Sequence, residues 1–560
     1  MSAACRGGTA LVCLLALAPG LAPADVPPAG VASEPGFCEE GDPAALEDQL
    51  ADQGEARPLA LRWRLRGDGW DGGSLQAYQR LEWRLGEGRE VYLLAERDPG
   101  EPRWPDFAAF YLAWQAPHRP LSVVAGDLLP GWGAGLVFGR ASGPASLPLT
   151  QPGTDSRRVG YRSAAEMRSL RGVWVGRRGG SWSAEGLLGQ AWRDGRLGAD
   201  GSVTSLPEDG IHVTRTEREG RRLLRLRAAA GRLRWTGRRV QAGLSLLDLG
   251  FDRRVDLRRP ERKPWAFAGG GQVLAGADAA VRLGRLRASG EAARDRAGHG
   301  ALVGGVRLRL PRLRLRAVGR WYDPGYQTFF GGAASRGGME NERGLMVCAE
   351  GRGWQAFTDR YRRPERTYYY PLPARVRAWG AAGQRGLGKT HALRLQLRQD
   401  AAPRWTGGAP VAERTRSGRL EIEWRRPPPG PRGTLLRLRL EERRLHRSPG
   451  RGEGGRLASL LGRAGGGGWR AVLHLSGFLT DSYATRIYEY EYDLPGTVTV
   501  RPLYGRGWRL CALLSRAWAG GEVSGRYRLQ RDGRTRHHGG LQVDLWMDPL
   551  PRRGGPGRRG

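Results

Sequence analysis

The chain has 560 residues, 88 of them glycine, and a formal net charge of +35 at pH 7. Clustered basic side chains bind nucleic acids through their phosphates. Here, however, the arginines are spread along the whole chain and alternate with acidic residues, so charge alone does not indicate a DNA-binding protein. Beyond the first residues there is no run of 18 or more apolar residues. This excludes a helical membrane protein but not a membrane barrel, whose strands need only about 9–11 residues.

The first 24 residues are typical of an export signal. Arg6 supplies a positive charge, Thr9–Leu21 an apolar core, and Ala22-Pro23-Ala24 a small-residue cleavage site. Residues 1–24 are therefore expected to be removed after export. Residues 25–55 form a short acidic stub, expected in the periplasm. Its best helix candidate is Asp42–Leu50, with Asp42 as N-cap and Pro43 in the first turn.

From residue 56 to 547 the dominant pattern is an alternation of apolar and polar residues, which predicts β-strands. Leu59–Arg66 places Trp63 and Leu65 on one face and arginines on the other. Turn signals such as Asp68-Gly69 and Asp532-Gly533 separate such runs. We predict an all-β domain, a transmembrane antiparallel up-and-down β-barrel of roughly 22–26 strands by these strand and turn templates.

Two features favour a membrane barrel over a soluble β-protein. The polar face of each run is often charged, and charges stay hydrated in a lumen but are costly in a dry core. Tryptophans also stand near the predicted strand ends, which suits interfacial girdles. They are Trp63, Trp70, Trp83, Trp104, Trp132, Trp235, Trp321, Trp379, Trp424 and Trp508.

The stretch Val306–Trp321 predicts one hairpin of this wall. Its leucines alternate with arginines on both sides of Pro311, so a tight turn at the proline would place leucines against lipid and arginines inward. The same alternation predicts an arginine-rich lumen. Its candidate lining residues are Arg62, Arg64, Arg307, Arg309, Arg314, Arg316, Arg437, Arg439, Glu489, Glu491 and Asp493.

The end of the chain gives a further indication. His538–Trp546 alternates like the C-terminal targeting strand of outer-membrane barrels, but a basic tail at 548–560 follows where that pattern has a terminal aromatic residue. The composition of the tail predicts disorder. Export and this strand together predict the outer membrane of a diderm bacterium as the location.

Several segments in order resemble a known family, the large bacterial outer-membrane barrels often described as helix-hairpin-helix domain proteins. They include GDLLPGWGAGLVFGR (Gly126–Arg140), GYRSAAEMRSLRG (Gly160–Gly172), WYDPGYQTFFGG (Trp321–Gly332) and TDSYATRIYEYEYDLPG (Thr480–Gly496). The resemblance implies a barrel and an outer-membrane location. The helix-hairpin-helix module that precedes the barrel in relatives is absent from this chain, and the family offers no catalytic residues to carry over.

Three motifs suggest chemistry but have simpler interpretations. Gly383–Thr390 matches a phosphate-binding loop, yet a strand pattern follows it where that loop requires a helix. His474 and Ser476 share one strand face, as in lipid hydrolases, but that face is expected to be the lumen. His537 and His538 are adjacent and would point to opposite faces of a strand. We therefore predict no enzyme activity, no metal and no cofactor.

The sequence best supports a pore or transport barrel that favours anionic solutes, since rows of arginine raise the local anion concentration. One alternative is a non-conducting receptor or envelope scaffold whose lumen is filled by salt bridges and folded loops. Another is a barrel associated with DNA binding or uptake. The expected partners are outer-membrane lipid, the barrel-assembly machinery and an anionic solute; a nucleic acid is disfavoured.

Overall fold

The computed structural model describes residues 61–547, apart from 71–74, 86–87, 117–118, 140–158, 368–369, 407, 427–432, 449, 451 and 498, and without the side chains of 61, 62, 68 and 70. The predicted signal at 1–24, the stub at 25–55 with its helix at 42–50, and the tail at 548–560 lie outside the described residues. These boundaries stay predictions.

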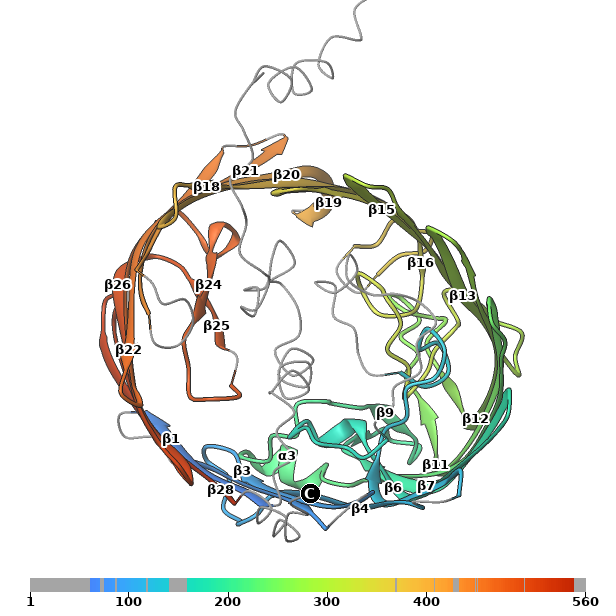
Figure 1. Cartoon of the computed structure of the whole chain (residues 1–560). Coiled ribbons are helices and arrows are strands. Elements are labelled where there is room, and N and C mark those ends of the chain that lie inside the picture. Colours follow the sequence, from blue (N-terminus) through green and yellow to red (C-terminus); the bar gives the residue numbers. More distant parts are fainter. Residues whose placement is uncertain are drawn as a thin grey trace, which may run out of the picture.

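The described chain forms a closed antiparallel barrel of 24 strands, which confirms the predicted fold (Figure 1). Each strand pairs with the next, and β28 pairs with β1 to close the ring. The wall consists of β1 (Leu61–Trp70), β2 (Gln76–Arg84), β3 (Arg89–Arg97), β4 (Phe107–Gln115), β5 (Leu121–Leu128), β6 (Leu170–Gly179), β7 (Trp182–Arg193), β10 (Leu224–Thr236), β11 (Val240–Asp256), β12 (Ala268–Leu283), β13 (Leu286–Asp295), β14 (Gly300–Arg309), β15 (Leu313–Tyr322), β16 (Glu342–Gly351), β17 (Trp354–Arg363), β18 (Ala374–Leu387), β19 (His391–Thr406), β20 (Ala409–Arg426), β21 (Thr434–Ser448), β22 (Glu453–Gly466), β23 (Trp469–Thr480), β26 (Arg506–Trp518), β27 (Gly521–Arg531) and β28 (Thr535–Met547).

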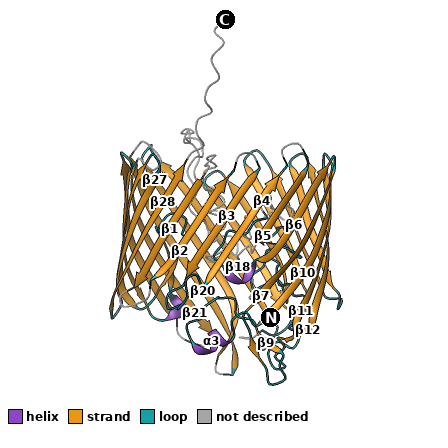
Figure 2. Cartoon of the chain, turned by 90° about the horizontal axis from the view of Figure 1, so that it is seen from below, coloured by secondary structure: helices purple, strands orange, loops and turns teal. Residues whose placement is uncertain are grey.

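The two rims of the barrel differ. Because neighbouring strands are antiparallel, connections alternate between the rims. The tight turns β6–β7, β12–β13, β14–β15 and β16–β17 share one rim with Leu61 and Met547, which we call the turn rim. The long connections β5–β6, β7–β10, β15–β16 and β23–β26 leave the other rim, the loop rim. Figure 2 shows the strands inclined between these rims. Outer-membrane barrels have this asymmetry, with short turns in the periplasm and long loops outside.

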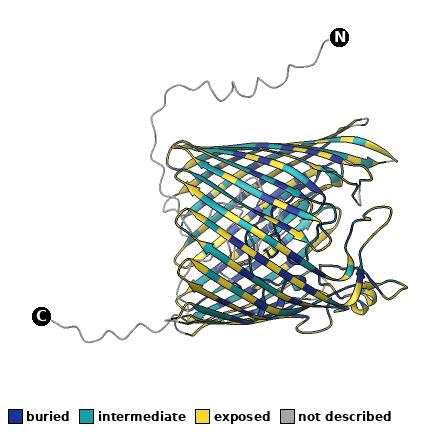
Figure 3. Ribbon diagram, turned by 90° about the vertical axis from the view of Figure 1, so that its right-hand side faces the viewer, coloured by how far each residue is buried: buried dark blue, intermediate teal, exposed yellow. Residues whose placement is uncertain are grey.

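Burial alternates along the wall, as Figure 3 shows. On β21, Leu436, Leu438 and Leu440 are 45%, 39% and 43% exposed, whereas Arg439 between them is 7% exposed. The same holds for β23, where Leu473 and Leu475 are exposed and His474 is buried. At these positions the outer face is apolar and the inner face polar, as a transmembrane barrel requires.

Tryptophans mark the turn rim. Most exposed indoles stand at the turn-rim ends of their strands: Trp63, Trp83, Trp114, Trp182, Trp354, Trp469 and Trp518; Trp104 and Trp508 are exposed on the loop-rim side. This agrees with an interfacial girdle. The prediction was wrong for Trp132, which is only 1% exposed and lies in the β5–β6 connection. The alternating pattern around Trp132 ends before it, because this segment leaves the wall.

The remaining elements belong to connections. They are the short strands β8 (Arg196–Leu197) and β9 (Val203–Ser205), the helix α3 (Arg215–Glu219), the 3-10 turns η2 (Glu166–Arg168) and η3 (Tyr483–Thr485), and the hairpin β24 (Ile487–Glu491) with β25 (Thr499–Leu503). None of the helices in the described ranges is long and apolar enough to span a membrane. The segment Gly383–Thr390 is a strand end and turn between β18 and β19, as its glycine pattern predicts.

The barrel lumen as candidate functional site

Four arginines form a row across four neighbouring strands on the inner wall. Arg282 on β12 is opposite Arg287 on β13, Arg287 is opposite Arg307 on β14, and Arg307 is opposite Arg316 on β15. All four share the strand face of buried inner residues, for example Leu274 on β12 and Val303 on β14. We call these four residues the arginine row. It lies inside the barrel near the turn rim.

A second line of charges adjoins the row. Arg309 is opposite Arg314, and Arg314 is opposite Glu350 on β16. Glu350 pairs with Arg314 at 3.2 Å and also with Arg316. The Arg314 side chain is still 59% exposed. This part of the inner wall therefore carries an excess of positive charge that remains accessible from the lumen.

Two groups of connections fold from the loop rim into the barrel. Figure 1 shows the β24–β25 hairpin inside the ring beside β22 and β26, and other loops inside it next to β11 and β16. The first group combines residues 129–139 of the β5–β6 connection with residues 323–341 of the β15–β16 connection. We call it the apolar plug. The hairpin is the second group.

The apolar plug packs as a small core within the lumen. Trp132, Leu136, Phe138 and Phe330 are at most 3% exposed. The rings of Phe138 and Phe330 stack with centroids 5.5 Å apart, and the Tyr326 hydroxyl donates to the carbonyl of Leu136 at 2.9 Å. The two connections are therefore joined to each other.

Two wall carboxylates hold the plug. Glu185 on β7 accepts a hydrogen bond from Trp132 Nε1 at 2.7 Å. Glu291 on β13 accepts the backbone N–H groups of Ala134 and Leu136 at 2.6 and 3.1 Å. Gly133 makes this approach feasible: its φ is +56°, and a Cβ there would lie 2.8 Å from Glu291 Oε2.

The hairpin is bound to the opposite part of the wall by ion pairs. Glu491 accepts from Arg509 at 3.0 Å and pairs with Arg528 at 2.9 Å. Asp493 pairs with both Arg526 and Arg528. All these side chains are at most 3% exposed. Burial alone would raise the pKa of Asp493, but the charges of Arg528 and Arg526 hold it well below its usual range, so the carboxylate is ionised at neutral pH.

Glu489 completes the hairpin's contacts. Ser476 donates its hydroxyl to one oxygen of Glu489, and His474 Nε2 lies 3.3 Å from the other. Burial would raise the pKa of Glu489, yet the hydrogen bond and charge of His474 lower it to about 2. Because Ser476 is bonded to the carboxylate and not to His474, the histidine is not placed to accept the hydroxyl proton, as a hydrolase would need.

The structure places the predicted lining residues as follows. Arg307, Arg309, Arg314 and Arg316 lie on the accessible inner wall described above. Arg64 is buried and pairs with Asp544 at 2.6 Å. Arg437 pairs with Glu423 at 2.7 Å, and Arg439 with Glu441 at 2.5 Å. The side chain of Arg62 lies outside the described part.

The three acidic candidates are not wall residues. Glu489, Glu491 and Asp493 lie on or just after β24, which pairs only with β25 as a two-stranded sheet. Their alternation with tyrosines predicts a strand, but it cannot tell a wall strand from one folded into the lumen. Sequence reasoning also missed Arg282 and Arg287, although their alternate positions on β12 and β13 carry the same signal as Arg307.

The adjacent residues His537 and His538 point to opposite faces of β28. His538 Nδ1 lies 2.6 Å from Arg526 in the lumen, and His537 Nδ1 lies 2.6 Å from the Tyr527 hydroxyl on the exposed side. Within the described ranges, no group of three or more His, Cys, Asp or Glu residues is arranged to hold a metal ion.

Comparisons with known proteins add little. No family model and no curated protein matches the chain, so no family model supports the resemblance to helix-hairpin-helix barrels. The P pilus usher PapC translocation pore is similar at 12% identity and a TM-score of 0.39, over 88% of this chain and 100% of that one. Pseudomonas aeruginosa OccK11 (OpdR) has 11% identity and a TM-score of 0.27, over 87% and 94%. OpdK with vanillate, from the same organism, has 10% identity and a TM-score of 0.29, over 87% and 97%. We infer no function from likeness at this level.

Proposed function

We propose that this chain is an outer-membrane pore for anionic solutes, which pass the arginine row between two inward-folded groups of loops. The observation that carries the proposal is the row itself. Arg282, Arg287, Arg307 and Arg316 stand directly opposite one another on four strands. Like charges in directly opposite positions destabilise a sheet, by roughly the 0.2–1 kcal/mol that such cross-strand pairs are worth.

Glu350 offsets part of this repulsion at Arg316, and an anion in the lumen would offset it further. Rows of arginine in a narrow, low-dielectric passage raise the local concentration of anions and lower that of cations. The guanidinium group also matches carboxylate and phosphate oxygens through two parallel hydrogen bonds. The favoured solutes are therefore small carboxylates or phosphates.

Reversal potentials test this proposal. Purified protein in a planar bilayer under a KCl gradient should conduct, with the sign of anion selectivity. The double substitution Arg287→Gln/Arg307→Gln should lower the chloride-to-potassium permeability ratio about threefold or more, since it removes two facing charges. Arg360→Gln/Arg377→Gln is the matched control, because these arginines are also opposite each other but lie on the outer face. Cation-selective conductance in the unmodified protein would overturn the proposal.

A non-conducting barrel is the second candidate, and the apolar plug favours it. Its buried aromatic side chains and the buried ion pairs of the hairpin occupy lumen space. If the unmodified protein carries no current while a variant lacking one of the wall anchors does, the barrel is closed at rest and serves as a receptor, a scaffold or a gated channel.

Location and partners belong to the same proposal. The apolar outer band and the asymmetric rims support an outer-membrane barrel with its turn rim in the periplasm. Lipid, the barrel-assembly machinery and an anionic solute are the proposed partners. Fractionation of a diderm host, with the chain recovered in the outer membrane in a heat-modifiable form, tests the location independently of conductance.

A further inference from the structure

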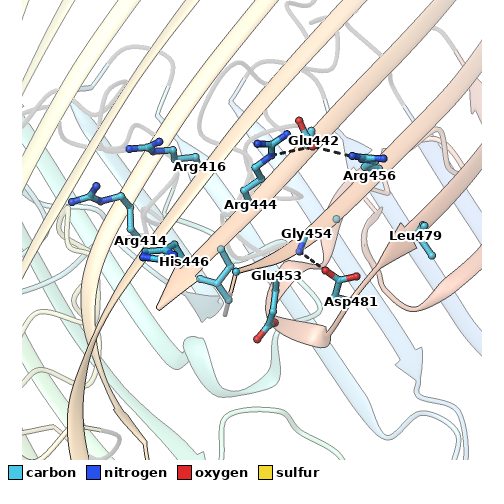
Figure 4. Close-up of a pocket in the computed structure, with 13 residues that line it drawn as sticks. Arg414, Arg416, Glu442, Arg444, His446, Glu453, Gly454, Arg456, Leu479 and Asp481 are labelled. Carbon is cyan, nitrogen blue, oxygen red and sulfur yellow. Dashed lines mark hydrogen bonds and ion pairs between the residues drawn. The ribbon is translucent and has the colours of Figure 1, made fainter. Parts of the chain in front are cut away.

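The outer face of β20, β21 and β22 carries a second group of arginines that the pore does not use. Arg414 and Arg416 on β20, Arg444 on β21 and Arg456 on β22 alternate with inward residues and share the face of the exposed leucines. Arg416 is opposite Arg444, and Arg414 is opposite His446. We call the four arginines the outer patch; Figure 4 shows them on one side of the three strands.

The patch begins where the apolar band ends. On β20 and β21, Leu420 is opposite Leu440, and the next outward-facing pair is Gly418 and Glu442. Arg416 and Arg444 follow one step nearer the loop rim. An arginine facing lipid costs about 2–4 kcal/mol at the bilayer midplane but about 0–1 kcal/mol near the interface. The outer patch therefore lies at the level of the lipid headgroups on the loop-rim side.

These residues line a groove of about 670 Å³ together with Leu479 of β23. Glu442 faces the same groove and pairs with Arg444 at 3.0 Å and Arg456 at 3.5 Å. Arg444 and Arg456 nevertheless keep 71% and 75% of their side-chain surface exposed. Arg414 and Arg416 form no ion pair with any carboxylate in the described part of the chain.

The other acidic side chains at the groove are occupied. Asp481 accepts the N–H of Gly454 at 2.6 Å, and Glu453 bonds to Arg447 and Ser482. Four arginines thus face one outward carboxylate, with an exposed leucine at the edge. The chemistry that complements this surface has phosphate oxygens next to acyl chains, because arginine binds phosphate through two parallel hydrogen bonds and leucine packs on hydrocarbon.

We propose that the outer patch binds the phosphorylated glycolipid headgroup of the surrounding outer leaflet. Its phosphates would lie between Arg416, Arg444 and Arg456, and its acyl chains along Leu440 and Leu479. This inference uses the outer-membrane location in the proposed function but not conductance. A closed barrel in that membrane would bind the lipid equally well.

Lipid A binding to the detergent-folded full chain tests the proposal. Native mass spectrometry or a fluorescent lipid A titration should show binding that the triple variant Arg416→Gln/Arg444→Gln/Arg456→Gln weakens about tenfold or more. Enzymatically dephosphorylated lipid A should bind the unmodified protein as weakly as lipid A binds the variant. Arg385→Gln, an exposed outer-face arginine near the turn rim, should leave the affinity unchanged.

Three results would overturn the proposal: equal affinity of the triple variant and the unmodified protein, equal binding of dephosphorylated lipid A, or full competition by inorganic phosphate, which would mean a free-anion site. Heat-modifiable gel mobility shows whether the triple variant folds. If it does not, the comparison of lipid A with its dephosphorylated form on the unmodified protein decides alone. If the unmodified protein binds lipid A but gives no conductance in bilayers, the pore proposal fails and the lipid-binding proposal stands.

Discussion

The carboxylate of Glu291 accepts a hydrogen bond from the backbone N–H of Ala134 at 2.6 Å, although 157 positions separate the two residues. The same oxygen accepts the N–H of Leu136 at 3.1 Å. One wall side chain thus fixes two backbone donors of the apolar plug, two positions apart. Hydrogen bonds to charged groups contribute about 1.5–3 kcal/mol, so this contact is a main determinant of where the plug lies.

Substitution Glu291→Gln should loosen the plug without unfolding the barrel. The amide keeps one acceptor but loses the charge, so hydrogen exchange at Ala134 and Leu136 should accelerate about tenfold. Exchange on β13 and β14 should stay slow. Glu350→Gln is the matched control, because it removes an inner-wall charge that pairs with arginines and not with the plug. Unchanged exchange at Ala134 in Glu291→Gln would contradict this role.

Substitution Asp493→Asn should release the hairpin. Arg526 and Arg528 are at most 3% exposed and would lose a charged partner, which costs about 3–5 kcal/mol for a buried pair. The temperature of the heat-modifiable transition should fall, and any conductance should become larger or noisier. Asp532→Asn removes a partner of Arg536, whose side chain is 51% exposed, so it should cost at most about 1 kcal/mol. Equal effects of the two substitutions would show that burial does not matter here.

Period-two alternation was sufficient to predict the wall but not its contents. On β14 and β15 it predicts both strands, the turn at Pro311 and the face of every arginine, because one residue of shift would turn all leucines into the lumen. It cannot locate Glu489 and Trp132, since a hairpin folded inside a barrel alternates like a wall strand, and a loop packed on aromatic residues has no period. Those positions depend on contacts such as Glu291 with Ala134, which are far apart in the sequence.

Depth along the outer face should govern tolerance to charge. Leu438 lies in the apolar band of β21 and is 39% exposed. Leu438→Arg should lower the free energy of unfolding by about 2–4 kcal/mol in lipid vesicles, measured by urea titration. Leu310 is similarly exposed, at 40%, but stands in the β14–β15 turn. Leu310→Arg should cost about 1 kcal/mol or less, and a larger cost there would argue against the assigned membrane boundary.

The loop rim should become less stable as pH rises. Burial, together with the charge of Asp106, raises the pKa of Glu166 from its usual value to about 8. Its side chain packs against Gly210 of the β7–β10 connection. A raised pKa means that the folded rim binds the proton more tightly than the unfolded chain does. The stabilisation is therefore complete below the ordinary carboxyl pKa and is lost as pH rises through about 8.

Limited proteolysis checks this pH dependence. Cleavage near Arg215 in the β7–β10 connection, normalised to an unfolded substrate, should be several-fold faster at about pH 9 than at about pH 6. Glu166→Gln should remove most of the difference, because the amide does not titrate. Burial and the charge of Asp106 raise the pKa of Asp98 to about 6. We therefore expect Asp98 to add a weaker pH dependence of the cleavage rate at lower pH. A profile that stays steep in Glu166→Gln would assign the effect to another group.

The pairing of β1 with β28 has a consequence for biogenesis. Leu61 is opposite Met547 and Trp63 is opposite Leu545, so the ring is completed by the first and last strands of the domain. A nascent or truncated chain without β28 would expose the unpaired backbone of both β1 and β27, and such open edges recruit other strands and aggregate. Partial barrels therefore need protection until translation and export have delivered the final strand, and loss of only the last dozen residues of the wall should be as damaging as a large internal deletion.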